Sequence, residues 1–488
     1  MIDNKKLVRI AGETNVTSDE AKLKEYSSDF SFVQAMKPQY VVKPRSTTDI
    51  EKLVKLARET LTPLIPVSSG PPHFRGDTVP STGEGIIIDL SGMKKIIMVD
   101  RVNRSTMFEP GVTFTELIRA VAKKGLRLNL PLLPRKSKSV VGSLLERESP
   151  IMPKYHWDIS DPTNCFEVVF GTGDVFRTGA AAGPGSIEEQ WEAGGAQKEA
   201  AGPSSSSWYR IIQGAQGTMG IVSWATARCE LIPNLEEPFL VGSSQLDKIL
   251  DLVQWLIRLR LVNECFVLNN LDLAAILAQK WPVDYLKLKS DLPPWLLFFN
   301  IAAYEYLPEL RIKGQIEDMQ GLAKRIGLEA VQQIGSLSAR NLLELVQRPS
   351  KEPYWKMRRK GSCQDLFFVT TCDEIPRLVA AMSGETEKAG YPAAEMGIYL
   401  QPIVQGVNWH CEFNFFFDPA DPHESEKVKQ LIANAIPGLM DKGAFFSRPY
   451  GENARMIMNR DAATVAALHK VKSILDPDKI MNPGKLCF

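Results

Sequence analysis

Short β-branched runs alternate with helix-like segments in the first half of the chain, and this alternation is the feature that most limits how the chain can fold. The runs predict strands at residues 40–44, 64–67, 86–90, 96–99 and 106–109. Helices are predicted at 50–60, behind the N-cap candidates Thr47 to Asp49, and at 114–124, between Thr113 and Gly125. This order predicts βαβ-like units with small sheets.

The pattern changes after a stretch rich in Gly, Ala and Ser at residues 179–207, which we predict to be a long loop and not a packed element. A strand is predicted at 221–231. From there to about residue 444, helices alternate with longer strands, as expected for an α+β second domain. The helices are predicted at 246–261 and 307–326, and the strands at 295–304, 366–371 and 397–402. A helix at 462–475 precedes the C-terminal tail.

Composition excludes several classes of protein. The 488 residues include 58 Lys and Arg against 57 Asp and Glu, and this balance argues against nucleic-acid binding. We find no apolar stretch of about 18 residues that could span a membrane, and the N-terminus does not resemble a secretory signal. The seven cysteines are scattered and never spaced as C-x-x-C, so we expect no metal site and predict a reducing, cytoplasmic location.

The common nucleotide and hydrolase fingerprints are missing: we find no P-loop, no G-x-G-x-x-G after an early strand, no G-x-S-x-G and no H-E-x-x-H. Three loops of small residues appear instead. Each could bring backbone N–H groups close to a phosphate or a planar ligand, but each could equally be a tight packing turn. The loops lie at 68–76, 139–143 and 214–222.

One predicted strand, at 408–418, carries His410, Glu412 and Asn414 on one face and apolar side chains on the other. Two interpretations remain open at this point. The polar face could simply be half-solvated. Alternatively, it could form a proton-accepting wall.

Several blocks occur in a recognisable order. They include "IDLSGMKKI" at 88–96, "EPGVT" at 109–113, "GTMGIV" at 217–222 and "LDPDKIMNPGKL" at 475–486. Further blocks of the same order are found at residues 38–50, 69–80, 125–134 and 139–143. In this order the chain resembles the flavin oxidoreductases with the FAD-binding fold of vanillyl-alcohol oxidase and para-cresol methylhydroxylase.

The resemblance implies an α+β architecture: a two-subdomain FAD-binding domain of the para-cresol methylhydroxylase type and an α+β cap domain with an antiparallel sheet. Residues 1–235 would form the N-terminal part of the FAD-binding domain, 236–444 the substrate or cap domain, and 445–488 a segment that returns to the FAD domain. The FAD-binding residues that the resemblance implies are Ser68, Ser69, Gly70, Pro71, Pro72, His73, Gly76, Pro134, Ser139, Val140, Gly142, Ser143, Gly217, Gly220, Ile221, Val222, Asn482 and Lys485.

Three features depart from the family pattern. Pro71 and Pro72 stand where many relatives have glycines, and the flavin-facing loop has a single glycine, Gly142. Residues 145–159 lack the usual "N-x-A-x-N" pattern. His73 falls near the position where some relatives attach the flavin covalently, but we do not expect a covalent link here because the surrounding loop is atypical.

The resemblance also implies hydride transfer from a substrate carbon to flavin N5. His410 would be the base or substrate anchor, with Glu412 and Tyr399 beside it. Arg448, Tyr450 and Arg455 occupy the positions of a substrate-binding cluster. Because strand 408–418 lacks the "G-N-x-H-x-N" pattern of many hydroxy-acid dehydrogenases, a small alcohol-type or para-substituted phenolic substrate is favoured.

The alternatives are a 2-hydroxy-acid dehydrogenase of the D-lactate or glycolate type, and a flavoprotein subunit that passes electrons to a partner. The electron acceptor would be oxygen, a quinone or an electron-transfer protein. A homo-oligomer or a larger oxidoreductase complex is compatible with either reading.

Overall fold

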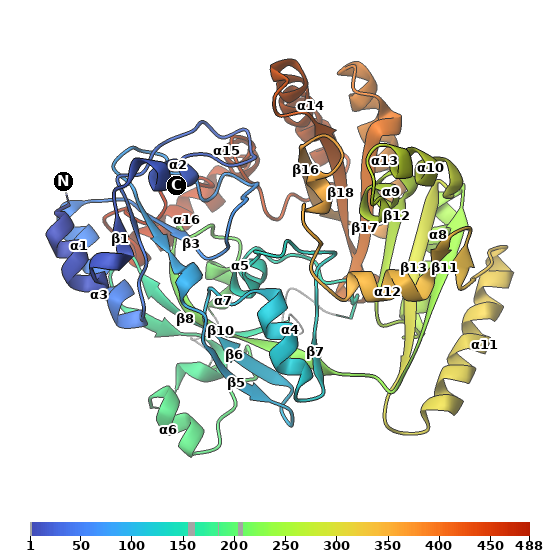
Figure 1. Ribbon diagram of the computed structural model, residues 1–488, viewed down its shortest axis with the longest axis horizontal. Coiled ribbons are helices and arrows are strands. Elements are labelled where there is room, and N and C mark those ends of the chain that lie inside the picture. The colour runs from blue at the N-terminus through green and yellow to red at the C-terminus, as the bar shows by residue number, and fades with distance from the viewer. Residues whose placement is uncertain (1, 155–161, 184, 204–207) are drawn as a thin grey trace.

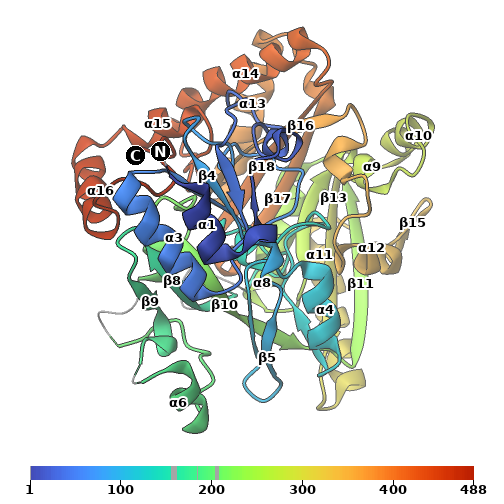
Figure 2. The same ribbon diagram turned by 60° about the vertical axis from the view of Figure 1, so that its left-hand side comes forward.

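The structure is a computed structural model that describes residues 2–154, 162–183, 185–203 and 208–488 (Figure 1). It is α+β, as predicted. A four-stranded and a six-stranded sheet (the small sheets) lie on one side of the molecule, and a six-stranded antiparallel sheet of mostly longer strands (the large sheet) lies on the other. Both chain ends lie on the side of the small sheets, as the turned view also shows (Figure 2). No helix in the described ranges is long and apolar enough to cross a membrane.

The first sheet has the strand order β1-β2-β4-β3. Strands β2, β4 and β3 run parallel, because a helix connects β2 to β3. The apolar faces of α1 and α3 pack on this sheet and bury side chains such as Ile50 and Val54. The bounds of these elements are α1 Asn4–Ala11, β1 Val16–Thr17, α2 Glu20–Glu25, β2 Tyr40–Val42, α3 Thr47–Thr60, β3 Leu64–Val67 and β4 Ile86–Asp89.

The second sheet is antiparallel in the order β5-β6-β10-β8-β9, with β7 paired to β10. Helix α4 begins at the predicted cap, where the Thr113 side chain and Glu116 form a capping box, and the chain turns at Gly125 with a φ of 69°. The bounds are β5 Ile96–Asp100, β6 Ser105–Phe108, α4 Phe114–Ala122, β7 Leu126–Leu128, α5 Val140–Leu145, β8 Thr163–Phe170, β9 Val175–Arg177, α7 Tyr209–Ile212 and β10 Gly220–Leu231.

The large sheet has the order β11-β13-β12-β17-β18-β16. One face packs against α8, α11, α13 and α14, and the other packs in part against α9, α10 and α12. The bounds are β11 Leu235–Ser243, α8 Leu246–Arg258, β12 Cys265–Asn269, α9 Asn270–Leu277, α10 Val283–Asp291, β13 Trp295–Ala303, α11 Pro308–Ile326, α12 Ala339–Val346, β16 Ser362–Thr370, α13 Ile375–Lys388, β17 Met396–Ile403, β18 Asn408–Phe417 and α14 Pro422–Met440.

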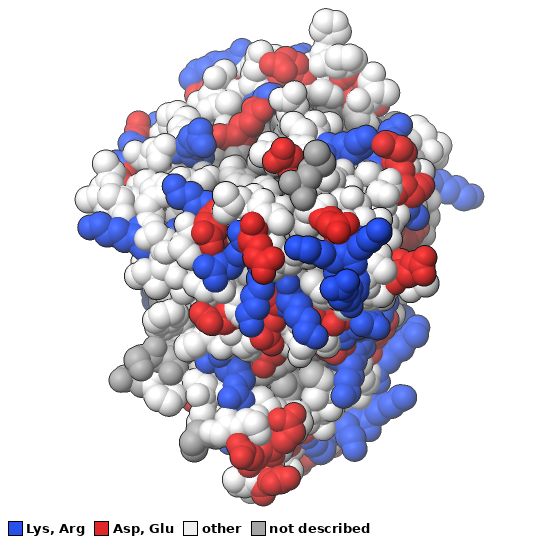
Figure 3. All heavy atoms as spheres, turned by 90° about the vertical axis from the view of Figure 1, so that its left-hand side faces the viewer, with Lys and Arg blue, Asp and Glu red and all other residues white. Residues whose placement is uncertain are grey.

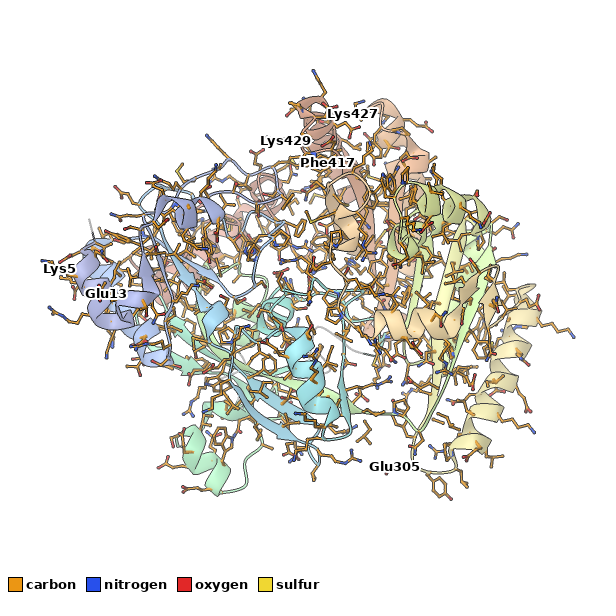
Figure 4. All side chains as sticks on the ribbon, in the orientation of Figure 1. Lys5, Glu13, Glu305, Phe417, Lys427 and Lys429 are labelled. Carbon is orange, nitrogen blue, oxygen red and sulfur yellow. The ribbon has the colours of Figure 1, made fainter. Side chains whose placement is uncertain are left out.

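The C-terminal segment returns to the first sheet. After α15 (Asn453–Met458) and α16 (Ala462–Leu475), Met481 bridges Leu64 of β3 in parallel. Ion pairs also cross between the two sides of the molecule. Glu305, labelled at the lower edge of Figure 4, lies 3.6 Å from Arg101, and Lys429 on α14 lies 2.9 Å from Glu452 ahead of α15. These pairs are exposed and each contributes little to stability.

The prediction for residues 179–207 was wrong in part. Ser186 and Glu189 form a capping box that starts the helix α6 (Ile187–Glu192), and Ile187 packs against Trp224 of β10. Residues 184 and 204–207 of this stretch lie outside the described residues, as do 155–159 of the stretch that lacks the family's asparagine pattern. On the face that carries α1 and α3, acidic and basic side chains are interspersed (Figure 3).

Candidate active site

A cavity lies where the loops of the small sheets meet the polar face of the large sheet. Of the residues predicted to bind FAD, Ser68, Ser69, His73, Pro134, Gly142, Gly217, Gly220 and Val222 line it. Of the predicted catalytic residues, Tyr399, His410, Glu412 and Tyr450 line it. The structure therefore brings residues from widely separated parts of the chain to one cavity, although their individual roles stay predictions.

The loops that line the cavity pack closely on one another. The Ser69 hydroxyl accepts a hydrogen bond from the Ser139 backbone N–H at 3.1 Å, and the Ser139 hydroxyl in turn accepts from the Gly142 N–H at 2.9 Å. A Cβ added at Gly142 would lie 3.0 Å from the Ser68 hydroxyl oxygen. At Gly217, where φ is 72°, an added Cβ would lie 2.4 Å from the Pro66 ring. The positive φ and the close Pro66 ring require glycine at Gly217, whereas at Gly142 an added Cβ would need the Ser68 hydroxyl to move by a few tenths of an ångström.

The other predicted FAD-binding residues lie behind these loops and not on the cavity wall. Asn482 donates to the backbone oxygens of Asp77 and Gln216 at 2.9 and 2.7 Å, and Lys485 donates to those of Gly76 and Val79 at 2.8 and 2.7 Å. The C-terminal signature thus holds the loops in place. The residues that do not line the cavity are Gly70, Pro71, Pro72, Gly76, Ser139, Val140, Ser143, Ile221, Asn482 and Lys485.

The donor groups of the loop half fit FAD. Ser68, Ser69, Thr78, Arg135 and Lys138 line the cavity, and hydroxyl and cationic groups of this kind suit an anionic diphosphate. Lys138 also pairs with Glu146 and Glu148. His73 also lines this half. Burial, with the nearby Arg135 guanidinium, lowers the pKa of His73 to about 3, so its ring is neutral at ordinary pH.

The polar face of strand β18 lines the other half and is buried, not half-solvated. His410 is 3% exposed and Glu412 is 8% exposed. In the antiparallel register Tyr399 pairs with Glu412, so both side chains lie on the cavity face. His410 Nε2 lies 3.2 Å from Glu412 Oε2, and His410 Nδ1 lies 3.4 Å from an Nη atom of Arg448.

The segment that carries Arg448 is fixed by the loops of the FAD side. The Arg147 and Gln216 side chains each donate to a backbone oxygen of this segment, those of Ser447 and Pro449, at 2.7 Å. Arg448 itself donates to the Glu146 oxygen at 2.9 Å. Burial lowers the pKa of Arg448 to about 10, which leaves the guanidinium charged at neutral pH.

Tyr450 and Arg455 have different positions. The Tyr450 ring lies beneath the Arg75 guanidinium, 5.0 Å from the ring centre to Cζ, and faces the cavity. Arg455 is exposed on α15 and does not line the cavity. Of the two arginines predicted for this cluster, Arg448 lines the cavity and Arg455 does not, and Arg75 adds a second guanidinium.

Three charged residues at this end of the cavity were missed by sequence reasoning: Arg75, Lys356 and Asp365. Lys356 Nζ lies 2.7 Å from Glu412 Oε1 and 2.8 Å from Asp365 Oδ2. Arg75 lies 3.5 Å from Asp365 and stacks on the Phe367 ring at 4.6 Å. Arg75 belongs to the predicted diphosphate loop, but only the backbone N–H groups of that loop were expected to bind the ligand. Lys356 and Asp365 are isolated in the sequence and form no motif.

The pKa shifts in this cluster follow from burial and from neighbouring charges. Burial lowers the pKa of His410, the hydrogen bond and charge of Glu412 oppose that shift, and Arg448 and Lys356 add to it. Burial alone would raise the pKa of Glu412, but the Lys356 ammonium and the His410 hydrogen bond hold it well below its usual range. The cluster therefore presents a neutral imidazole beside a carboxylate and two cations. In the described part of the chain, His, Cys, Asp and Glu side chains form no group that could hold a metal ion.

Residues 38–179 match the FAD binding domain family, and residues 450–486 match the C-terminal domain of the FAD linked oxidases. The glycolate oxidase subunit GlcD of Bacillus subtilis is 22% identical over 98% of this chain and 95% of that protein. The mitochondrial D-lactate dehydrogenase (cytochrome) of Arabidopsis thaliana is 24% identical over 97% of this chain and 78% of that protein.

Among solved structures, that of p-cresol methylhydroxylase with substrate bound superimposes with a TM-score of 0.81 at 18% identity, over 99% of this chain and 96% of that one. The matches at both ends identify the chain as an FAD-linked oxidoreductase, and it shares the fold of p-cresol methylhydroxylase.

Proposed function

We propose that the chain dehydrogenates a small 2-hydroxy acid. The observation that carries this proposal is the adjacency of a cationic anchor and a base: Arg448 Nη and His410 Nδ1 lie 3.4 Å apart in the same cavity. A 2-hydroxy acid carries its carboxylate and its hydroxyl on neighbouring carbons. Two protein groups in direct contact can therefore hold both at once.

In this proposal Arg448 binds the substrate carboxylate through its guanidinium fork. The substrate hydroxyl takes the place of the Arg448 contact at His410 Nδ1, which accepts the hydroxyl proton, and Glu412 stabilises the imidazolium that forms. The Arg75 guanidinium, stacked on Phe367 and Tyr450, adds positive charge beside the developing anion. FAD, when bound, supplies the acceptor for the hydride from the carbinol carbon.

A second candidate is a para-substituted phenol or aryl alcohol. Aromatic side chains favour it, because Phe74, Tyr354, Trp355, Tyr399 and Tyr450 line the cavity. A phenolate oxygen could then take the place of the carboxylate beside Arg448 and Tyr450. In a para-substituted phenol, however, the ring separates the oxygen anion from the reacting carbon. A base in contact with the anchor would then be far from that carbon.

The experiment that tests the proposal is anaerobic mixing of the FAD-loaded protein with single substrates, followed by the loss of flavin absorbance. The panel contains D- and L-2-hydroxy acids, para-alkylphenols and aryl alcohols. We expect bleaching with one enantiomeric series of 2-hydroxy acids. Bleaching by phenols or aryl alcohols alone would support the second candidate. If neither group bleaches the flavin, both proposals fail.

We also propose that residues 1–235 and 445–488 form the FAD-binding part of the chain and that residues 236–444 form the cap. The bridge between Leu64 and Met481 and the 2.7 Å ion pair between Arg58 and Asp478 support it, because they join the two ends of the chain. The electron acceptor can be identified with the same reduced protein. Oxygen, a quinone and an electron-transfer protein are added separately, and the acceptor is the one that restores the flavin absorbance.

A further inference from the structure

Lys356 is a buried charge that the proposed reaction does not use. It lies on a short 3-10 turn, Trp355–Met357, ahead of β16, and points at the polar face of the large sheet. Lys356 is only 7% exposed. Burying an ammonium is costly unless it is paired, and Lys356 is paired twice, with Glu412 at 2.7 Å and with Asp365 at 2.8 Å.

Lys356 belongs to a row of alternating charges. Glu146, Arg75, Asp365, Lys356 and Glu412 follow one another at 3.4, 3.5, 2.8 and 2.7 Å. The row joins the loops of the FAD side to strand β18 and ends beside His410. Each inner member is held between two partners of opposite charge, so a single change in the row affects the groups on both sides of it.

The consequence for Glu412 is that its two oxygens have separate partners. Oε1 accepts from Lys356, and Oε2 faces His410 Nε2 at 3.2 Å. A carboxylate that is kept ionised only accepts hydrogen bonds, so His410 must carry its proton on Nε2. Arginine only donates, so the Arg448 contact at 3.4 Å requires Nδ1 of the same ring to be the acceptor.

We propose that Lys356 is a positioning residue for His410: by holding the Glu412 carboxylate ionised and in place, it fixes, together with Arg448, the tautomer that is protonated at Nε2 and keeps its Nδ1 lone pair toward Arg448. This inference rests on the proposed function only for the identity of the base. The tautomer itself is a property of the protein and can be measured without a substrate.

The groups around His410 define what should change when Lys356 is lost. Glu412 faces it from its own strand, Tyr399 from β17 with 5.6 Å between ring centres, Arg448 from the C-terminal segment and Lys356 through Glu412. Without the ammonium, Asp365 and Glu412 are two buried carboxylates that share less positive charge. Glu412 then gains a proton more easily, and a protonated carboxyl can donate to Nε2 and release the other tautomer.

The experiment is NMR of protein labelled with ¹⁵N-histidine. The chain has five histidines, and the signal lost in His410→Asn identifies His410. In the wild type we expect a single tautomer protonated at Nε2. In Lys356→Met we expect the ratio of the two tautomers to shift about tenfold or more, the size expected for losing a hydrogen bond to a charged group. Lys356→Arg, which keeps the charge, should restore the wild-type pattern.

The matched control is Lys289→Met, which removes another cap lysine that pairs with a glutamate, Glu395, at 2.9 Å, but lies outside the cavity. This variant should leave the His410 signals unchanged. A folded Lys356→Met protein, judged by its circular dichroism, that keeps the single Nε2–H tautomer would overturn the proposal. So would a tautomer change that Lys356→Arg fails to reverse. If the tautomer changes as expected but no hydroxy acid bleaches the flavin, the positioning role stands and the proposed substrate does not.

Discussion

The change His410→Asn tests the base most directly. Asparagine is smaller than histidine and keeps a polar group that can bond to Glu412, so the buried carboxylate retains a donor. The variant loses the lone pair of a neutral imidazole, which is the group that accepts the substrate proton in the proposed reaction. The residue is 3% exposed, so water does not readily replace it as a base.

General-base catalysis contributes about 10² to 10⁴ in rate. We expect the rate constant of flavin reduction to fall by that factor, which corresponds to about 3–5 kcal/mol in the activation free energy. Arg448 remains in place and still binds the carboxylate, so the substrate dissociation constant should change much less, by about threefold at most. A split of this kind separates a lost base from a lost binding group.

The pH dependence gives the sign of the effect. Burial lowers the pKa of His410 below its ordinary value of about 6.5, so the ring stays neutral as the pH falls through that value. The acid limb of kcat/KM should therefore lie below pH 6.5 in the wild type and should disappear in His410→Asn. Because the pKa of His410 is lower in the folded state than in the unfolded state, His410 contributes folding stability at pH values above its unfolded-state pKa. This contribution is lost as the pH falls toward its folded-state pKa.

The assay is anaerobic stopped-flow reduction of the FAD-loaded protein across pH 5 to 8, with absorbance at the flavin band. The matched control is His469→Asn, in a histidine on α16 that does not line the cavity and packs against Phe488. An unchanged reduction rate in a folded, FAD-loaded His410→Asn protein would refute the base assignment. A loss that appears only in substrate affinity would make His410 an anchor instead.

Three further predictions concern other parts of the molecule. Lys472→Met leaves the Asp476 carboxylate buried without its cation and should lower the free energy of unfolding by about 3–5 kcal/mol in urea denaturation. Acid precipitation should release all FAD into the supernatant, since no link through His73 is expected; flavin that stays in the pellet and is lost in His73→Ala would contradict this. Arg455→Ala should leave the reduction rate within about twofold, because the side chain is exposed away from the cavity, and a larger loss would return Arg455 to the site.

Local sequence signals predicted much of the fold because each of them fixes a nearby backbone geometry. The Thr113 and Glu116 capping box starts α4 where expected, and Gly125 adopts the positive φ that ends its last turn. The loop prediction for residues 179–207 was wrong in part because it relied on average composition and not on a local signal. The composition of this stretch suggested a loop, but the pair Ser186 and Glu189 caps a helix within it, and a local cap outweighed the average composition.

The site was predictable only where it follows a strand. Alternation placed His410 and Glu412 on one face, and the family blocks placed Tyr450 near them. Lys356 could not be found in this way. It lies 56 residues from Glu412 in sequence, and the contact exists because a short turn before β16 folds back over the sheet. Such a pairing depends on tertiary packing, which no periodicity encodes.

The row of charges also bears on why this end of the cavity is built as it is. A buried ion pair is weak evidence for stability, because apolar residues of similar volume often stabilise a fold as well or better. Glu146, Arg75, Asp365, Lys356 and Glu412 nevertheless lie together at the edge of one cavity, and the row ends at a neutral imidazole. Stability alone would favour replacing the row with apolar side chains, and the neighbouring Phe367 and Tyr399 show that aromatic residues fit here. If the row sets the protonation of His410, it explains why charged side chains are present at this end of the cavity, which packing alone does not explain.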